Sequence, residues 1–133
     1  MGVAQIGSNV YLFGGFGVGG TRNDIRKFNT ETETISTLST TLPQDAHNMG
    51  VAQVGSNVYL FGGFETGARS TVNTIRKFNT ETETITELSA TLPQALSEIG
   101  VAQVGSDVYL FGGYKSGSSS NIVSTIYKFS VDF

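Results

Sequence analysis

GVAQIGSNVYLFGG at residues 2–15 returns as GVAQVGSNVYLFGG at residues 50–63 and as GVAQVGSDVYLFGG at residues 100–113. The copies follow one another at a period of about 50 residues, and repetition at a fixed period of this length is typical of chains built from one supersecondary unit used several times. The sequence therefore predicts a repeat protein. Its fold depends on what one unit contains.

A second repeated block confirms the period. IRKFNTETETI is identical at residues 25–35 and 75–85, and its beginning returns as IYKF at residues 126–129. The third copy stops there, so the chain holds two full units and most of a third.

Each unit contains four strand signals, which we call a to d in chain order. In the second unit, strand a covers residues 50–54, and a tight Gly-Ser-Asn turn leads to strand b at residues 58–61, which the glycine doublet Gly62-Gly63 ends. Strand c is expected at about residues 73–78. After the polar turn at 79–84, strand d follows from residue 85 to about residue 88.

Four short antiparallel strands repeated in this way predict stacked sheets, because one small sheet cannot bury both of its faces alone. We therefore expect an all-β fold of β-propeller blades. The first blade covers residues 2–49, the second residues 50–99, and an incomplete third residues 100–133 of one domain.

The repeated residues resemble a known family. Glycine doublets after an apolar strand (Gly14-Gly15, Gly62-Gly63 and Gly112-Gly113) are followed by an aromatic residue (Phe28, Phe78 and Phe129) where kelch repeats usually have Tyr. Ile35 and Ile85 stand where that family usually has Trp, which suggests a slimmer core between blades. The resemblance covers essentially the whole chain, and it implies a kelch-type propeller.

An arc of three blades leaves two faces uncovered, since propellers close with 4 to 8 blades. The outer faces of the first and third blades should carry the same apolar residues that pack between blades elsewhere, such as Val58 and Leu60. Two copies related by a two-fold axis would give six blades, so we predict a homodimeric ring. The alternative is a fragment of a longer propeller whose missing d strand came from sequence ahead of Met1.

The composition argues against several partners and chemistries. A net charge of -3 with only eight Lys plus Arg offers no basic face for nucleic acid, and no apolar run approaches the roughly 20 residues that span a bilayer. The chain has no cysteine, and His47 is its only histidine. We therefore expect no metal centre, no cofactor and no catalysis. The compartment stays open.

One rim of the blades varies between the copies. The b–c loops at residues 17–24, 65–73 and 115–124 differ in length and sequence, and so do the d–a segments at 44–48 and 94–98, whereas the turns at the other rim are almost unchanged. Loops that diverge on a fixed scaffold are where binding residues are usually placed. The charged or titratable residues there are Arg22, Asp24, Asp45, His47, Arg69, Glu98 and Lys115.

These features predict a non-catalytic binding or scaffold module that presents the b–c and d–a loops to a protein, peptide or glycan. The main alternative is a structural one, in which a designed or excised propeller half self-assembles and the seven rim residues are ordinary solvated loop positions. A fragment of an enzyme is a distant alternative, with His47 as the one credible base.

Overall fold

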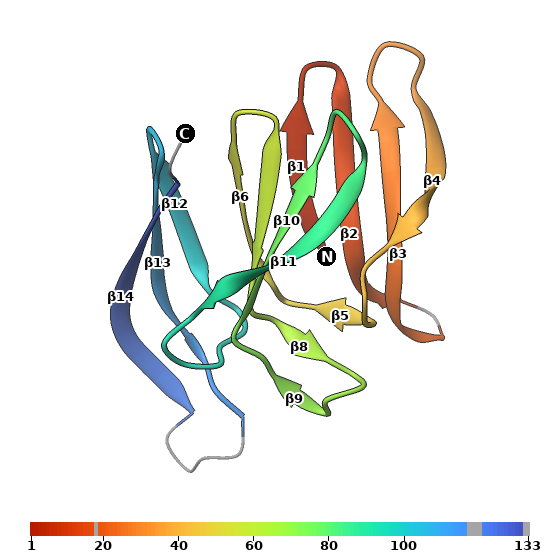
Figure 1. The fold of residues 1–133 in the computed structure, drawn as a ribbon. Helices are drawn as coiled ribbons and strands as arrows, with labels where there is room; N and C mark the ends of the chain where they lie inside the picture. The colour runs from red at the N-terminus through yellow and green to blue at the C-terminus, as the bar shows by residue number, and fades with distance from the viewer. Residues whose placement is uncertain (18, 117–120, 132–133) are drawn as a thin grey trace.

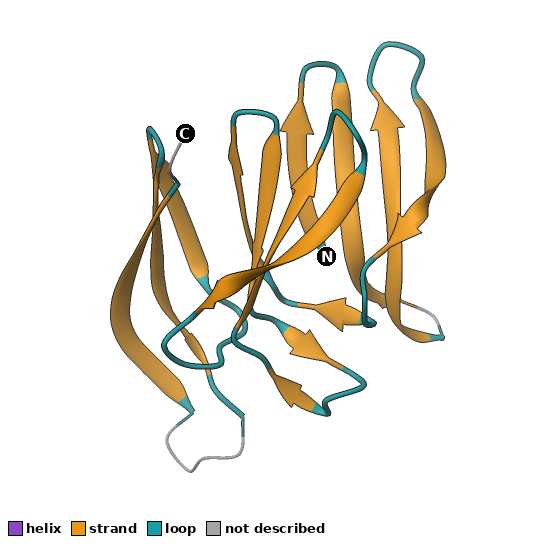
Figure 2. Cartoon of the chain, viewed as in Figure 1, coloured by secondary structure: helices purple, strands orange, loops and turns teal. Residues whose placement is uncertain are grey.

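The computed structural model describes residues 1–17, 19–116 and 121–131, and every regular element in this part of the chain is a β-strand. Three antiparallel sheets stand side by side (Figure 1), and strands and loops account for all that is described (Figure 2). The predicted all-β architecture of repeated blades is confirmed.

Each blade is an antiparallel meander in chain order. The first contains β1 (Gly2–Ile6), β2 (Asn9–Gly17), β3 (Gly20–Asn29) and β4 (Thr34–Thr41). The second contains β6 (Gly50–Val54), β7 (Asn57–Phe61), β10 (Thr74–Asn79) and β11 (Thr84–Thr91). The third contains β12 (Gly100–Val104), β13 (Asp107–Tyr114) and β14 (Ile122–Ser130), while residues 132 and 133, where its c–d turn is expected to begin, lie outside the described residues.

Two strand boundaries differ from the prediction. The glycine doublet ends strand b in the second blade, but β2 and β13 run through it with a register shift. The torsion angles of Gly14 (φ 57°) and Gly62 (φ 58°) are alike, so they do not account for this difference. Strand d is also longer than expected. A register shift between Thr74 and Arg76 lets β10 and β11 pair again as far as Thr74 with Thr91.

A small extra sheet joins the first two blades. It contains β5 (Ala46–His47), β8 (Phe64–Glu65) and β9 (Ser70–Thr71) in the order β5-β8-β9. Here the d–a segment of the first blade pairs with the b–c loop of the second. A single bridge between Ser97 and Tyr114 repeats the arrangement between the second and third blades.

The hydrophobic core lies between blades. One cluster packs Tyr11, Phe13 and Ile25 of the first blade against the second, and the next packs Tyr59, Phe61 and Ile75 of the second against the third. Val58 and Leu60 are buried in the first of these clusters, as predicted. The a strands β1, β6 and β12 lie against their neighbours, as expected for the inner strands of radial blades.

The outer face of the third blade is open. In the second blade Val54, Phe61 and Ile75 are 3%, 0% and 2% exposed, whereas their equivalents in the third blade are 67%, 43% and 64% exposed. We call this face the third flank; it consists of Ala102, Val104, Tyr109, Phe111 and Ile126.

The outer face of the first blade is open in the same way. Val58, Leu60 and Phe78 are buried in the second blade, but their equivalents Val10, Leu12 and Phe28 are only half-buried. We call this face the first flank; it consists of Val3, Val10, Leu12, Phe28 and Ile35. Both flanks therefore carry residues that are interior elsewhere in the same chain.

Candidate ligand-binding rim

The b–c loops and d–a segments gather at one end of the blades, the lower end in Figure 1, while the a–b and c–d turns lie at the other. Backbone bonds link them across blades. The amide of Thr66 donates to the carbonyl of Asp45 at 3.1 Å, and the amide of Glu98 donates to the carbonyl of Asn48 at 2.9 Å. These bonds join the d–a segment of the first blade to the b–c loop and to the d–a segment of the second.

Arg22 and Asp24 form an ion pair on β3. Nε and Nη2 of Arg22 each donate to an oxygen of Asp24 at 3.0 Å, and Nε of Arg26 lies 3.6 Å from Oδ2 of the same carboxylate. The hydrogen bond from Arg22 lowers the pKa of Asp24, against a smaller opposing effect of burial. Asp24 is therefore a carboxylate at neutral pH.

His47 lies between two aromatic rings. Its imidazole stacks on Phe64 at a centroid distance of 5.2 Å and meets Phe16 edge-on at 5.9 Å, and Phe16 itself is 75% exposed. Asp45, two residues earlier, is half-buried. The aromatic contacts hold the imidazole in place between the first two blades.

The remaining predicted residues lie further along the rim. Arg69 is exposed in a turn closed by the bond from its amide to the carbonyl of Thr66, and exposed Glu98 accepts a long bond of 3.4 Å from Asn48 Nδ2. Lys115 is half-buried, and residues 117–120 of its loop lie outside the described residues. The structure thus brings Arg22 and His47 to one place, with Asp24 bonded to Arg22, but it does not gather all seven residues.

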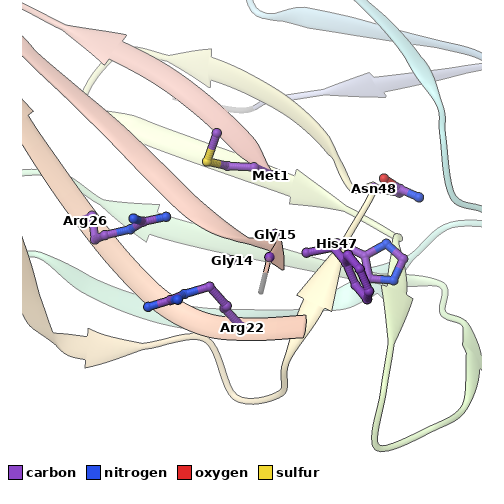
Figure 3. A pocket seen from close by; sticks show the side chains of 9 residues that line it. Met1, Gly14, Gly15, Arg22, Arg26, His47 and Asn48 are labelled. Carbon is purple, nitrogen blue, oxygen red and sulfur yellow. The ribbon is translucent and has the colours of Figure 1, made fainter. Parts of the chain in front are cut away.

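That place is a pocket of about 430 Å³ beside the first blade. In Figure 3 the side chains of Arg22 and Arg26 lie on one side of Gly14 and Gly15, and His47 and Asn48 lie on the other. The lining is completed by Met1, Phe16 and Gly17. Sequence reasoning missed Arg26, because it falls inside a framework block that is identical in two copies.

The second blade fills the corresponding position with an ion pair. Nη1 of Arg76, the equivalent of Arg26, donates to Oε2 of Glu65, and both side chains are buried. At the position of Glu65, the first blade has Gly17 and the third has Lys115. This three-way difference at one position is the signal that could have revealed the pocket.

Within residues 1–17, 19–116 and 121–131, no group of three or more His, Cys, Asp or Glu side chains could hold a metal ion. Nor does this part of the chain contain a helix long and apolar enough to cross a membrane.

Antiparallel four-stranded blades with cores between them define a repeat protein of the β-propeller class. The family model of the KLHDC2/KLHL20/DRC7 Kelch-repeats domain matches residues 1–132, so the chain belongs to the kelch-repeat family. A search of the curated proteins found no significant match. Kelch-repeat domains generally serve as protein-interaction or scaffold modules and are typically non-catalytic.

Proposed function

We propose that this chain is a non-catalytic binding or scaffold module that pairs with a second copy to form a six-bladed ring. The ring presents the b–c and d–a rim to a protein, peptide or glycan. The observation that carries the proposal is the exposure of both flanks, whose residues are buried or partly buried where the same face meets another blade.

The interface between the first and second blades is the template for closure. There, one face contributes Tyr11, Phe13 and Ile25, and the other contributes Val58, Leu60 and Phe78. The third flank has Tyr109, Phe111 and Ile126 at the positions of the first set, and the first flank has Val10, Leu12 and Phe28 at the positions of the second set. The third flank of one copy therefore matches the first flank of another.

Aromatic geometry supports the match. Phe13 meets Phe78 edge-on at 5.3 Å between the first two blades, and Phe61 meets Phe129 edge-on at 5.3 Å between the next two. The same pairing would place Phe111 of one copy against Phe28 of the partner subunit. A two-fold axis makes both contacts at once and gives six blades, which is within the range of closed propellers.

The substitution Ile126→Arg tests the role of the flanks, because it places a charge on the third flank at a residue that is 64% exposed in one chain. We expect a folded monomer by circular dichroism and sedimentation, because burying an unpaired charge is costly only in the assembled ring. Thr82→Arg, at an exposed turn of the second blade, is the matched control and should leave assembly unchanged. An Ile126→Arg variant that assembles like the control contradicts ring closure.

A second candidate function is purely structural self-assembly, favoured by the near-identity of the framework blocks. Rim and framework can be separated with variants at the two ends of the blades. A partner protein retained by the immobilised chain should be lost with Arg69→Ala or Lys115→Ala and kept with Glu31→Ala or Glu81→Ala. None of the four variants should change the mass of the assembled protein in solution. Equal retention by all four variants favours the structural alternative.

A further inference from the structure

The residue after the glycine doublet pairs with the d–a segment of the preceding blade in the second and third blades. The backbones of Tyr114 and Ser97 exchange two hydrogen bonds of 2.8 Å, and Phe64 pairs with His47 in the small sheet. At the equivalent position in the first blade, Phe16 pairs with Thr21 of its own hairpin and with no other described residue. The edge that faces the pocket is therefore open to a strand.

The same pocket has an arginine without its carboxylate. Arg76 is paired with Glu65, but Arg26 faces Gly17, which has no side chain. Among the described residues, the carboxylate recorded beside Arg26 is that of Asp24, whose Oδ2 lies 3.6 Å from Nε and already accepts a hydrogen bond from Arg22. Two guanidinium groups, Arg22 and Arg26, thus share one carboxylate, which leaves one excess positive charge beside the pocket.

We propose that this slot binds an extended peptide segment that pairs with the backbone of Phe16 and places a Glu or Asp side chain on Arg26. Ala46, in the d–a segment of the first blade, lies directly opposite Glu65 of the second blade. Side chains of directly paired residues lie on the same face of a sheet, so a residue opposite Gly17 points toward Arg26. The proposal goes beyond ring closure, because every residue of the slot belongs to one chain.

There is room for the acidic side chain. A Cβ atom on Gly17 would meet only the Arg22 side chain, at 4.0 Å, and the backbone of Gly17 is outside the left-handed region. The incoming carboxylate would replace what Glu65 supplies within the second blade. Backbone pairing gives such a complex its affinity, and the arginine gives it specificity.

The test uses two capped peptides that copy residues 41–48, part of the segment that lies against the second blade and ending before the position that Met1 occupies at the first blade. One carries Ala46→Glu and the other Ala46→Gln, and both are titrated against the full chain by fluorescence anisotropy. We expect the Glu peptide to bind about tenfold more tightly than the Gln peptide, with the difference shrinking at high salt. Equal affinities, or no binding of either peptide, would overturn the proposal.

Two substitutions in the chain locate the site. Gly17→Glu supplies the carboxylate internally, so it should abolish the preference for the Glu peptide while the chain stays folded. Arg26→Gln should remove the preference by deleting the guanidinium, and Lys77→Gln, the same charge change in the second blade, should leave it intact. A preference that survives Gly17→Glu and Arg26→Gln would place the binding elsewhere.

The mass of the chain measured in the same samples keeps the two proposals distinct. A monomer that discriminates between the peptides supports the slot and contradicts the ring. A dimer that does not discriminate contradicts the slot alone.

Discussion

Glu83 joins the first two blades through polar contacts beside their apolar core. Its carboxylate accepts hydrogen bonds from Tyr11 OH at 3.1 Å and Lys27 Nζ at 2.9 Å, and its carbonyl accepts one from Thr40 Oγ1 at 2.7 Å. Burial and, to a smaller extent, the bond to Glu83 raise the pKa of Tyr11 to about 12. This one residue of the c–d turn thus helps to fix the position of the second blade relative to the first.

This pKa predicts a loss of stability in alkali. Between pH 10.0 and about 12, Tyr11 keeps its proton in the folded state but loses it when unfolded, so the free energy of unfolding falls as pH rises. We expect Tyr11→Phe to remove about 1 to 2 kcal/mol of that fall in urea titrations at pH 9 to 11.5. Parallel losses in the variant and the parent would show that Tyr11 is not responsible.

Glu33 should perform the role of Glu83 at the ring junction. Both residues occupy the same position of the c–d turn in the left-handed region, at φ 56° and 54°. In the proposed ring, Glu33 would accept hydrogen bonds from Tyr109 and Lys128 of the partner subunit. Glu33→Ala should weaken dimerisation by about threefold to tenfold in dilution experiments, because charge-assisted bonds at a partly exposed interface are modest.

The control for that measurement is Glu31→Ala. Glu31 is an exposed carboxylate of the same turn, and only its backbone amide is bonded there, to Asn29 Oδ1. The two variants change the net charge equally. Equal weakening by both would mean that long-range charge, not the contact of Glu33, controls association.

At the scale of elements, the glycine doublets leave room for the d–a segment of one blade to pack against strand b of the next. Gly63 has φ 98°, and a Cβ there would come within 2.9 Å of the carbonyl oxygen of His47 and 3.1 Å of Met49 Cα. These neighbours belong to β5 and the residues after it. The doublet therefore serves both the bend of strand b and the pairing between blades.

Gly63→Ala should destabilise the protein by about 1 to 3 kcal/mol, since the new side chain meets backbone and the torsion angle is strained. Urea unfolding measures the change. Gly17→Ala is the matched control, and we expect it to stay within about 0.5 kcal/mol of the parent, because Gly17 has room and an ordinary backbone conformation. A tolerated Gly63→Ala would contradict the close approach of β5.

Strands a, b and c of the second blade lie within one residue of their expected bounds, because alternation and turn residues are local signals. β5, β8 and β9 were not predicted. Two-residue strands are too short to show a period, and β5 exists only through its pairing with β8 of the next blade. The buried ion pair of Glu65 with Arg76 was also missed, because Arg76 lies in a block that is identical in two copies.

At the scale of the whole molecule, the repeat makes each blade interface a copy of the last. Leu60 and Phe78 lie beneath the first blade, and Leu110 lies beneath the second. The sequence could therefore predict that the outer flanks are apolar, and the exposure of Phe111 and Ile126 confirms it. What covers the flanks depends on association between chains. Neither the local sequence pattern nor the fold of one chain determines that association.

Sedimentation equilibrium of the full chain across a range of concentrations tests ring closure most directly. Six blades from two copies predict a folded species at twice the 14.1 kDa of one chain, with dissociation only on dilution. A species that stays folded at 14.1 kDa at every concentration would leave both flanks in water and contradict the account.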